Sequence, residues 1–139
     1  MKTQSGSVML EALIAILIFS IGILALVGMQ ATAVSNVADA KYRADASFLT
    51  DQIVGVMWAS RAASGTVFIP DPTFACNPCG AANGNAATRA WSGANGVAGA
   101  LPNATSAIAI NGAQVTVTLT WRPPQAAAAH RHSVVATIN

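Results

Sequence analysis

Two cysteines and two histidines are the residues of this sequence best suited to redox or metal chemistry. Cys76 and Cys79 form the motif CNPC, and His130 and His132 form the motif HRH. Cysteines with this spacing can form a local disulfide, act as a redox couple at the start of a helix, or join both histidines around zinc. Prolines before and between the cysteines indicate a loop, which disfavours the redox couple. The zinc site is also disfavoured, because HRH leaves one residue between its histidines and familiar zinc motifs leave about three to five.

The carboxylates after residue 30 do not form a catalytic set. Asp39, Asp45 and Asp51 are spread along one expected helix, and Asp71 follows it. This spacing scatters the carboxylates instead of bringing them together, so they indicate a solvated face. No glycine-rich motif joins a strand to a helix, as a phosphate site requires. We therefore expect no enzyme activity, no cofactor and no metal.

The basic residues could form at most a weak nucleic-acid site. Seven Lys and Arg against five Asp and Glu leave a net charge of +2, which is too low to make nucleic acid the expected main partner. DNA binding stays an alternative. The residues that could carry it are Arg89, Arg122, Arg131, His130 and His132.

An uncharged apolar run dominates the N-terminus. Of the 139 residues, 53% are hydrophobic and 9% are charged, and the eighteen residues from Ala12 to Met29 contain no charge and no proline. This is the length of a membrane-spanning helix. Glu11 stands at the edge of the run, where a carboxylate costs on the order of 2 to 3 kcal/mol and needs a partner. Because the run holds no cation, that partner must be a lipid headgroup, another chain or a new amino group made by cleavage nearby.

An ordinary secretory signal peptide is the alternative reading of this run. Residues 31–33, Ala-Thr-Ala, resemble a small-residue cleavage site. Two features oppose this reading: the run is longer than the usual length of about 7 to 15 residues of such a peptide, and Glu11 stands at its edge, inside the stretch 8–29. Lys2 is the one charge before the run, so the positive-inside tendency keeps the N-terminus cytoplasmic.

Residues 6–30 read GSVMLEALIAILIFSIGILALVGMQ. They resemble the class III signal of type IV pilins and pseudopilins, in which a short basic leader ends in glycine and a glutamate is the fifth residue after the cut. Gly6 and Glu11 have that spacing. The resemblance implies that a prepilin peptidase cuts between Gly6 and Ser7 and methylates the new amine of Ser7. The family usually has Phe where this chain has Ser7, a departure that bears on the methylation more than on the cut.

The segment SIGILALVGMQ most resembles the PilV-type minor pilins, with type II secretion pseudopilins as close relatives. The resemblance implies a minor pilin that is held in the inner membrane, with a periplasmic head, before it enters an extracellular type IV pilus. Its partners would be the prepilin peptidase and other major and minor pilins, and it would help pilus assembly, initiation and adhesion. In this family, Glu11 would serve subunit assembly. The alternatives are a type II secretion pseudopilin, a DNA-binding minor pilin and a membrane-anchored periplasmic CxxC redox protein.

The expected membrane anchor also affects the expected oxidation state of the two cysteines. It would carry the rest of the chain into an oxidising compartment, where two cysteines normally pair. We therefore expect a disulfide between Cys76 and Cys79.

The helix should continue beyond the membrane to about Arg61, with Ser64 and Gly65 as its end, because no proline occurs before Pro70. An apolar stripe at helical spacing should pack on a sheet. The stripe is Val34, Ala38, Tyr42, Ala46, Leu49, Ile53 and Val56, and the expected solvated side is Asn36, Asp39, Arg43, Ser47, Thr50 and Asp51.

The remaining residues predict a small antiparallel sheet. Expected strands cover 66–69, 106–110, 113–121 and 133–138, and Asn111 with Gly112 signals a two-residue hairpin turn. Trp91 is expected to be buried in the irregular segment between Cys76 and Leu101, which could include a short helix. The fold class is therefore α+β. The expected organisation is a leader at 1–6, a transmembrane and filament-core half-helix at 7–29, an amphipathic half-helix at 30–63 and a β-rich head at 64–139.

Overall fold

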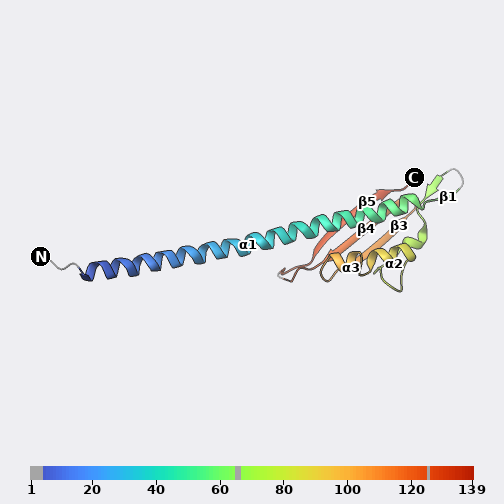
Figure 1. The fold of residues 1–139 in the computed structure, drawn as a ribbon. Coiled ribbons are helices and arrows are strands. Elements are labelled where there is room, and N and C mark those ends of the chain that lie inside the picture. Colours follow the sequence, from blue (N-terminus) through green and yellow to red (C-terminus); the bar gives the residue numbers. More distant parts are fainter. Residues whose placement is uncertain (1–4, 65–66, 125) are drawn as a thin grey trace. The chain divides into compact units, whose positions relative to one another are not determined.

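The computed structural model describes residues 5–64, 67–124 and 126–139. It has the α+β architecture expected from the sequence, with a long N-terminal helix and a small antiparallel sheet (Figure 1). Contacts divide the chain into two units, one up to Ala38 and the other from Asp39 to Asn139. The first four residues of the expected leader, and the expected helix-end residue Gly65, lie outside the described residues.

Helix α1 runs over Ser5–Ala59. Its last turn is closed by Ser60, whose backbone N–H and Oγ both donate to the Val56 carbonyl at 3.0 and 2.8 Å. The Arg61 guanidinium also donates to the Trp58 carbonyl at 2.9 Å. The helix therefore ends slightly earlier than expected.

A short hairpin takes the chain away from the end of the helix. Strand β1 (Ala62–Ser64) pairs antiparallel with strand β2 (Val67–Ile69). The expected strand at 66–69 is therefore present from Val67 onward, and Thr66 lies outside the described residues. Ser64, which was expected to end the helix, instead enters this β ladder.

The part of α1 that belongs to the second unit carries the core-facing stripe. Ala46, Leu49 and Ile53 are buried as expected, and Met57 extends the stripe by one turn. Thr50 contradicts the expectation of a solvated position, because it is fully buried and its hydroxyl donates to the Ala46 carbonyl at 2.8 Å. That bond satisfies the hydroxyl within its own helix, so the threonine can face the apolar core.

Two ends of the predicted stripe are not buried. Val34, in the first unit, is 69% exposed, and Val56, in the second, is 39% exposed. Tyr42 is half-buried against the core. The stripe thus packs on the head from about Tyr42 to Met57, and not over its whole predicted length.

The sheet has the order β3–β4–β5, all antiparallel: β3 is Thr105–Asn111, β4 is Gln114–Trp121 and β5 is His130–Thr137. Alternation along β4 buries every second side chain, as its sequence pattern predicted. The inward residues of β4 are Val115, Val117, Leu119 and Trp121, all buried against the second unit's core.

The hairpin between β3 and β4 turns one residue later than expected. Asn111 pairs with Gln114, so the central residues of the turn are Gly112 and Ala113, and Asn111 ends the strand. Gly112 has the positive φ (58°) that a type II′ turn needs at its first central residue. The Ala113 carbonyl accepts a 2.8 Å bond from the Ile138 N–H, so a contact with the C-terminus holds this register.

Strand β5 begins three residues before the predicted Ser133. His130 pairs with Trp121 and His132 with Leu119, which extends the ladder through the HRH motif. Both histidines alternate inward with Val134, whereas Arg131 points to the opposite face of the sheet. The motif is therefore part of an edge strand.

The segment between the helix and the sheet contains three short helical elements. A 3₁₀ helix, η1, covers Pro72–Phe74, and the helices α2 and α3 cover Ala86–Ser92 and Val97–Ala100. The Asn85 side chain caps α2 by accepting from the Thr88 N–H at 2.9 Å. The predicted burial of Trp91 is confirmed: its indole N–H donates to the Leu49 carbonyl of α1 at 2.8 Å.

Candidate functional site

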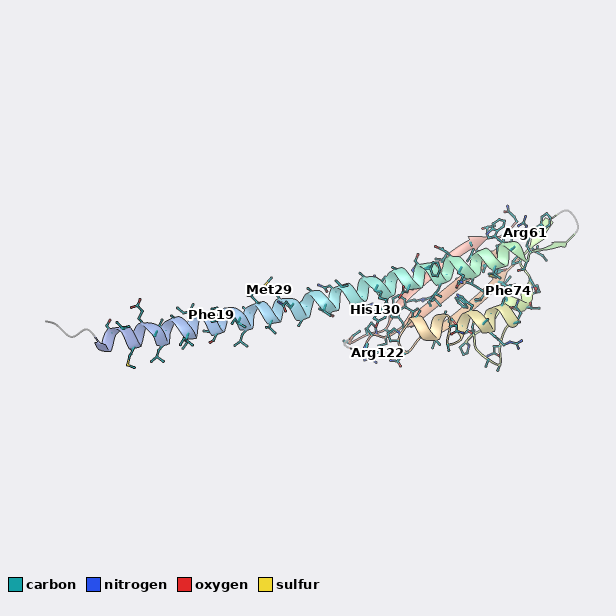
Figure 2. The ribbon with its side chains drawn as sticks, in the orientation of Figure 1. Phe19, Met29, Arg61, Phe74, Arg122 and His130 are labelled. Carbon is teal, nitrogen blue, oxygen red and sulfur yellow. A yellow bond between two sulfur atoms is a disulfide. The ribbon has the colours of Figure 1, made fainter. Side chains whose placement is uncertain are left out.

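The apolar run lies on α1 with its large side chains exposed. It gives α1 a window with a mean hydropathy of 2.8, none of it buried, and α1 is the one helix among the described residues that is long and apolar enough to span a membrane. Phe19 and Met29 stand out from the ribbon in Figure 2, at 69% and 71% exposure. A helix satisfies its own backbone polar groups, so this segment can enter the hydrocarbon core of a membrane as a single-pass anchor.

Ser7 and Glu11 lie one helical turn apart, on the same side of α1 as Ile14, Ala15 and Ile18. The Glu11 side chain is exposed, and residues 7–29 contain no Lys, Arg or His that could neutralise it. An amino group at Ser7 would stand within one turn of the carboxylate. The geometry therefore allows a pair between a new N-terminus and Glu11 of the same chain, or between groups of neighbouring chains.

The expected cleavage bond joins Gly6 to Ser7 in the first turns of α1. The backbone of both residues is described as helical. Cleavage at this bond stays a prediction from the sequence.

Cys76 and Cys79 form the expected disulfide. The Cys76 backbone exchanges two hydrogen bonds with Ile108 of β3, at 3.0 and 2.8 Å, and the Cys79 N–H donates to the Ser106 carbonyl at 2.8 Å. Cys76 is buried at 8% exposure. The disulfide thus closes a loop that is hydrogen-bonded to the outer edge of β3, which supports a structural role.

The structure does not bring the histidines to the cysteines. Cys76 bridges the outer edge of β3, and His130 and His132 lie on β5, at the other edge of the sheet. Three strand spacings, or roughly 14 Å, separate the Cys76 segment outside β3 from β5. Within the described ranges, no group of three or more potential ligands could hold a metal.

His130 and His132 instead lie on the inner side of the sheet. The His130 ring is 5.8 Å from the Trp121 ring, at an interplanar angle of 30°. Trp121 Nε1 and His132 Nε2 are both buried without a hydrogen-bond partner among the described residues.

The residues considered for nucleic-acid binding come from α2, from the segment after β4 and from β5. Arg89 lies on α2, and the Arg122 guanidinium donates to the carbonyls of Ala126 and Ala127 at 3.2 and 3.1 Å. Arg131 points to the outer face of the sheet, opposite to both histidines. Nucleic-acid binding by these residues stays a prediction from the sequence.

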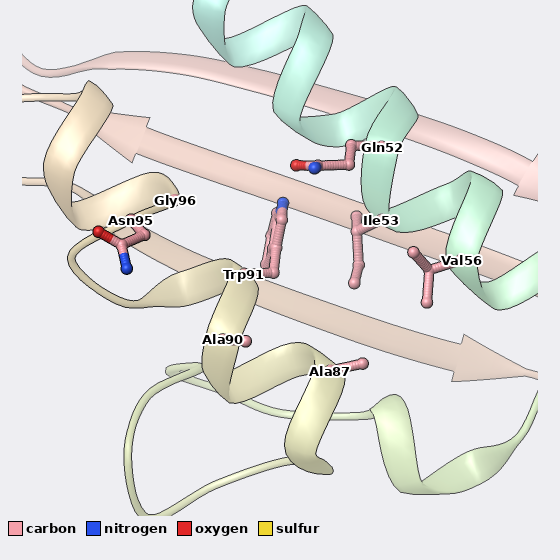
Figure 3. Close-up of a pocket in the computed structure, with 8 residues that line it drawn as sticks. All are labelled: Gln52, Ile53, Val56, Ala87, Ala90, Trp91, Asn95 and Gly96. Carbon is pink, nitrogen blue, oxygen red and sulfur yellow. The ribbon is translucent and has the colours of Figure 1, made fainter.

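A groove of about 320 Å³ lies between α1 and the α2–α3 segment. Figure 3 shows Ile53 and Val56 pointing from α1 toward α2, and the Trp91 ring standing between the two helices. The lining has no charged residue. It consists of Gln52, Ile53, Val56, Ala87, Ala90, Trp91, Asn95 and Gly96.

This groove was missed from the sequence. The capping residue Asn85 and the Ala-rich stretch after it could have predicted α2, since asparagine is a preferred N-cap. Its position beside α1 could not be predicted, because the residues that meet there are more than thirty positions apart.

Comparison of the chain with protein-family models, curated proteins and solved structures yields no match.

Proposed function

We propose that this chain is a leader-cleaved minor pilin that enters a type IV pilus through the apolar part of α1. The observation that carries the proposal is the coincidence of Gly6, Ser7 and Glu11, at the spacing of a pilin signal, with the uncharged run Ala12–Met29, whose side chains are all exposed. The small α+β head supports it, since the resemblance implies such a head.

In the proposed mechanism, the apolar helix leaves the bilayer and exchanges lipid contacts for contacts with other helices. Small residues on it allow close approach between helices. They are Ala12, Ala15, Gly22, Ala25 and Gly28. Glu11 compensates for its burial by pairing with an ammonium group, either at Ser7 of its own chain or at that of a neighbour.

The mass of the intact protein extracted from membranes tests this proposal. Loss of residues 1–6 alone, with or without one methyl group at Ser7, is expected. A chain that starts at Val34 would indicate ordinary secretion, and an uncut chain would indicate a plain anchor. Either result would contradict the proposal.

Co-purification separates the two members of the family that share this signal. A minor pilin is expected in sheared pili together with other pilins. Recovery only with components of a type II secretion system would assign the chain to the pseudopilins.

A further inference from the structure

The second unit exposes an aromatic side chain beside an unfilled apolar groove. Phe48 of α1 is 67% exposed and lies on the same side of the helix as Gln52 and Val56, which follow it by one and two turns and line the groove. Phe48 itself does not line the groove. Because side chains of a helix lean toward its N-terminus, Phe48 leans away from the groove of its own chain.

The other exposed aromatic of this unit already has a partner. The Arg61 guanidinium carbon lies 4.9 Å from the centre of the Phe68 ring and 5.3 Å from that of Trp58, within cation–π distance of both. No such contact is described for Phe48. Among the described residues of the second unit, Phe48 is therefore the exposed aromatic without such a contact.

The groove can receive one aromatic side chain. Its volume of about 320 Å³ exceeds the space that a phenylalanine side chain needs, and its walls are Ile53, Val56 and Trp91 with small alanines. Since no charged residue lines it, an apolar side chain can enter without removing a charge from water.

Charges around the two surfaces are complementary. Asp45 and Asp51 flank Phe48 three residues before and after it, so both lie near it on the helix surface. Asp45 is paired with Lys41 at 3.6 Å, whereas Asp51 has no ion pair among the described residues. Arg89, next to Ala90 on the groove, is exposed and likewise has no ion pair within the described part. An acidic group without an ion pair, Asp51, therefore lies near the aromatic, and a basic group, Arg89, stands beside the groove.

We propose that Phe48 of one copy of this chain inserts into the Gln52–Trp91–Asn95 groove of a second copy. The side chain and the groove are different surfaces, so the contact is heterologous. The inference rests on the proposed function for one point: membrane anchoring orients all copies in the same direction. Parallel copies would then be shifted along the helix by the four to eight residues between Phe48 and the groove, about 6 to 12 Å.

Photo-crosslinking of the full-length chain in cells tests the contact. With Phe48→p-benzoylphenylalanine, a dimer should form on illumination, and its crosslinked peptide should include residues 87–96 of a second copy. The matched control is Phe68→p-benzoylphenylalanine, which should not label that peptide. Absence of a dimer, or crosslinking of Phe48 to another protein, would overturn the inference.

Filling the groove tests it independently. Ala90→Phe places a ring in the groove and should lower the dimer yield at least tenfold. Ala98→Phe makes the same change at an exposed position of α3 that does not line the groove, and it should leave the yield unchanged. Near-ultraviolet circular dichroism checks that both variants fold, and an undiminished dimer in folded Ala90→Phe would refute the contact.

Charge reversal tests the choice of a second copy as partner. Arg89→Glu should lower the yield at least threefold in low-salt medium, and salt should shrink the difference. An unchanged yield would contradict the inference. The chain's presence in sheared pili is measured in parallel, so loss of the crosslink alone counts against this contact and absence from pili counts against the proposed function.

Discussion

Glu11 is the residue on which the proposed assembly step depends. Its carboxylate stands at the edge of eighteen uncharged residues, and residues 7–29 contain no basic side chain. Charged groups in such segments are usually functional and paired. The new amine at Ser7 is the nearest group that processing could supply.

Glu11→Val should preserve membrane insertion but lower the pilus-associated fraction at least tenfold, equivalent to about 1.4 kcal/mol. Removing the carboxylate makes the segment more apolar and leaves the ammonium without its partner in the filament. Quantitative immunoblots of membranes and sheared pili would measure both fractions. Glu11→Asp, which keeps the charge, serves as control, and normal incorporation of Glu11→Val would exclude the pairing role.

Trp91 connects the irregular segment to α1 through one hydrogen bond of its indole nitrogen. Its indole N–H donates to the Leu49 carbonyl in the core, where a low local dielectric strengthens the bond. The sequence predicted that the Trp91 side chain is buried, but it did not predict which group accepts the hydrogen bond of the indole.

Trp91→Phe should lower the free energy of unfolding by about 1 to 3 kcal/mol, since it removes a buried hydrogen bond and leaves a small cavity. Urea unfolding of the detergent-solubilised chain, followed by near-ultraviolet circular dichroism, would measure it. Trp58→Phe is the control, because Trp58 is half-buried and donates no described hydrogen bond. Equal effects of the two changes would contradict a specific role for the Trp91 bond.

At the scale of elements, glycine makes the close approach between α2 and α3 possible. A Cβ on Gly96 would lie 1.8 Å from the Trp91 carbonyl oxygen. The backbone at this point leaves no room for any side chain, so Gly96 holds one wall of the groove in place.

Gly96→Ala should therefore destabilise the head by about 2 kcal/mol, as overpacking typically does. Gly55→Ala provides the opposite case: nothing lies within 4 Å of its added Cβ on α1, so it should stabilise by about 0.5 to 1 kcal/mol. Thermal unfolding of both variants under one set of conditions would compare them. The argument fails if Gly96→Ala proves as stable as the unmodified chain.

The disulfide loop is attached to the sheet through β3. Cys76 and Cys79 are joined to each other and hydrogen-bonded to β3, so the loop extends the sheet by an isolated bridge. The CNPC spacing indicated pairing, whereas the attachment to β3 depends on residues about thirty positions away.

At the scale of the whole molecule, the apolar segment and the head are suited to different surroundings. The large side chains of the segment are exposed, while the head buries its own apolar residues around Ile53, Leu119 and Trp121. The segment therefore requires lipid or other helices, and the head can be surrounded by water.

Ile18→Arg should release the chain from membranes to alkaline carbonate, because an arginine near the centre of a spanning helix costs about 2.5 to 3.5 kcal/mol on insertion scales. Sedimentation after carbonate treatment would measure the released fraction. Ala33→Arg, just beyond the apolar run, should leave the chain in the membrane pellet. Complete retention of Ile18→Arg would argue against a spanning segment at this position.

Local patterns in the sequence were sufficient to predict the apolar helix, the alternation of β4 and the α+β class, since each depends on neighbours within a few residues. Tertiary contacts alone decided the burial of Thr50, the shift of the hairpin turn to Gly112 and Ala113, and the separation of His130 and His132 from the cysteines. The groove beside Trp91 was likewise decided by tertiary contacts. Each of these results depends on residues distant in the chain, and their meeting is determined by which arrangement buries the most apolar surface while satisfying polar groups.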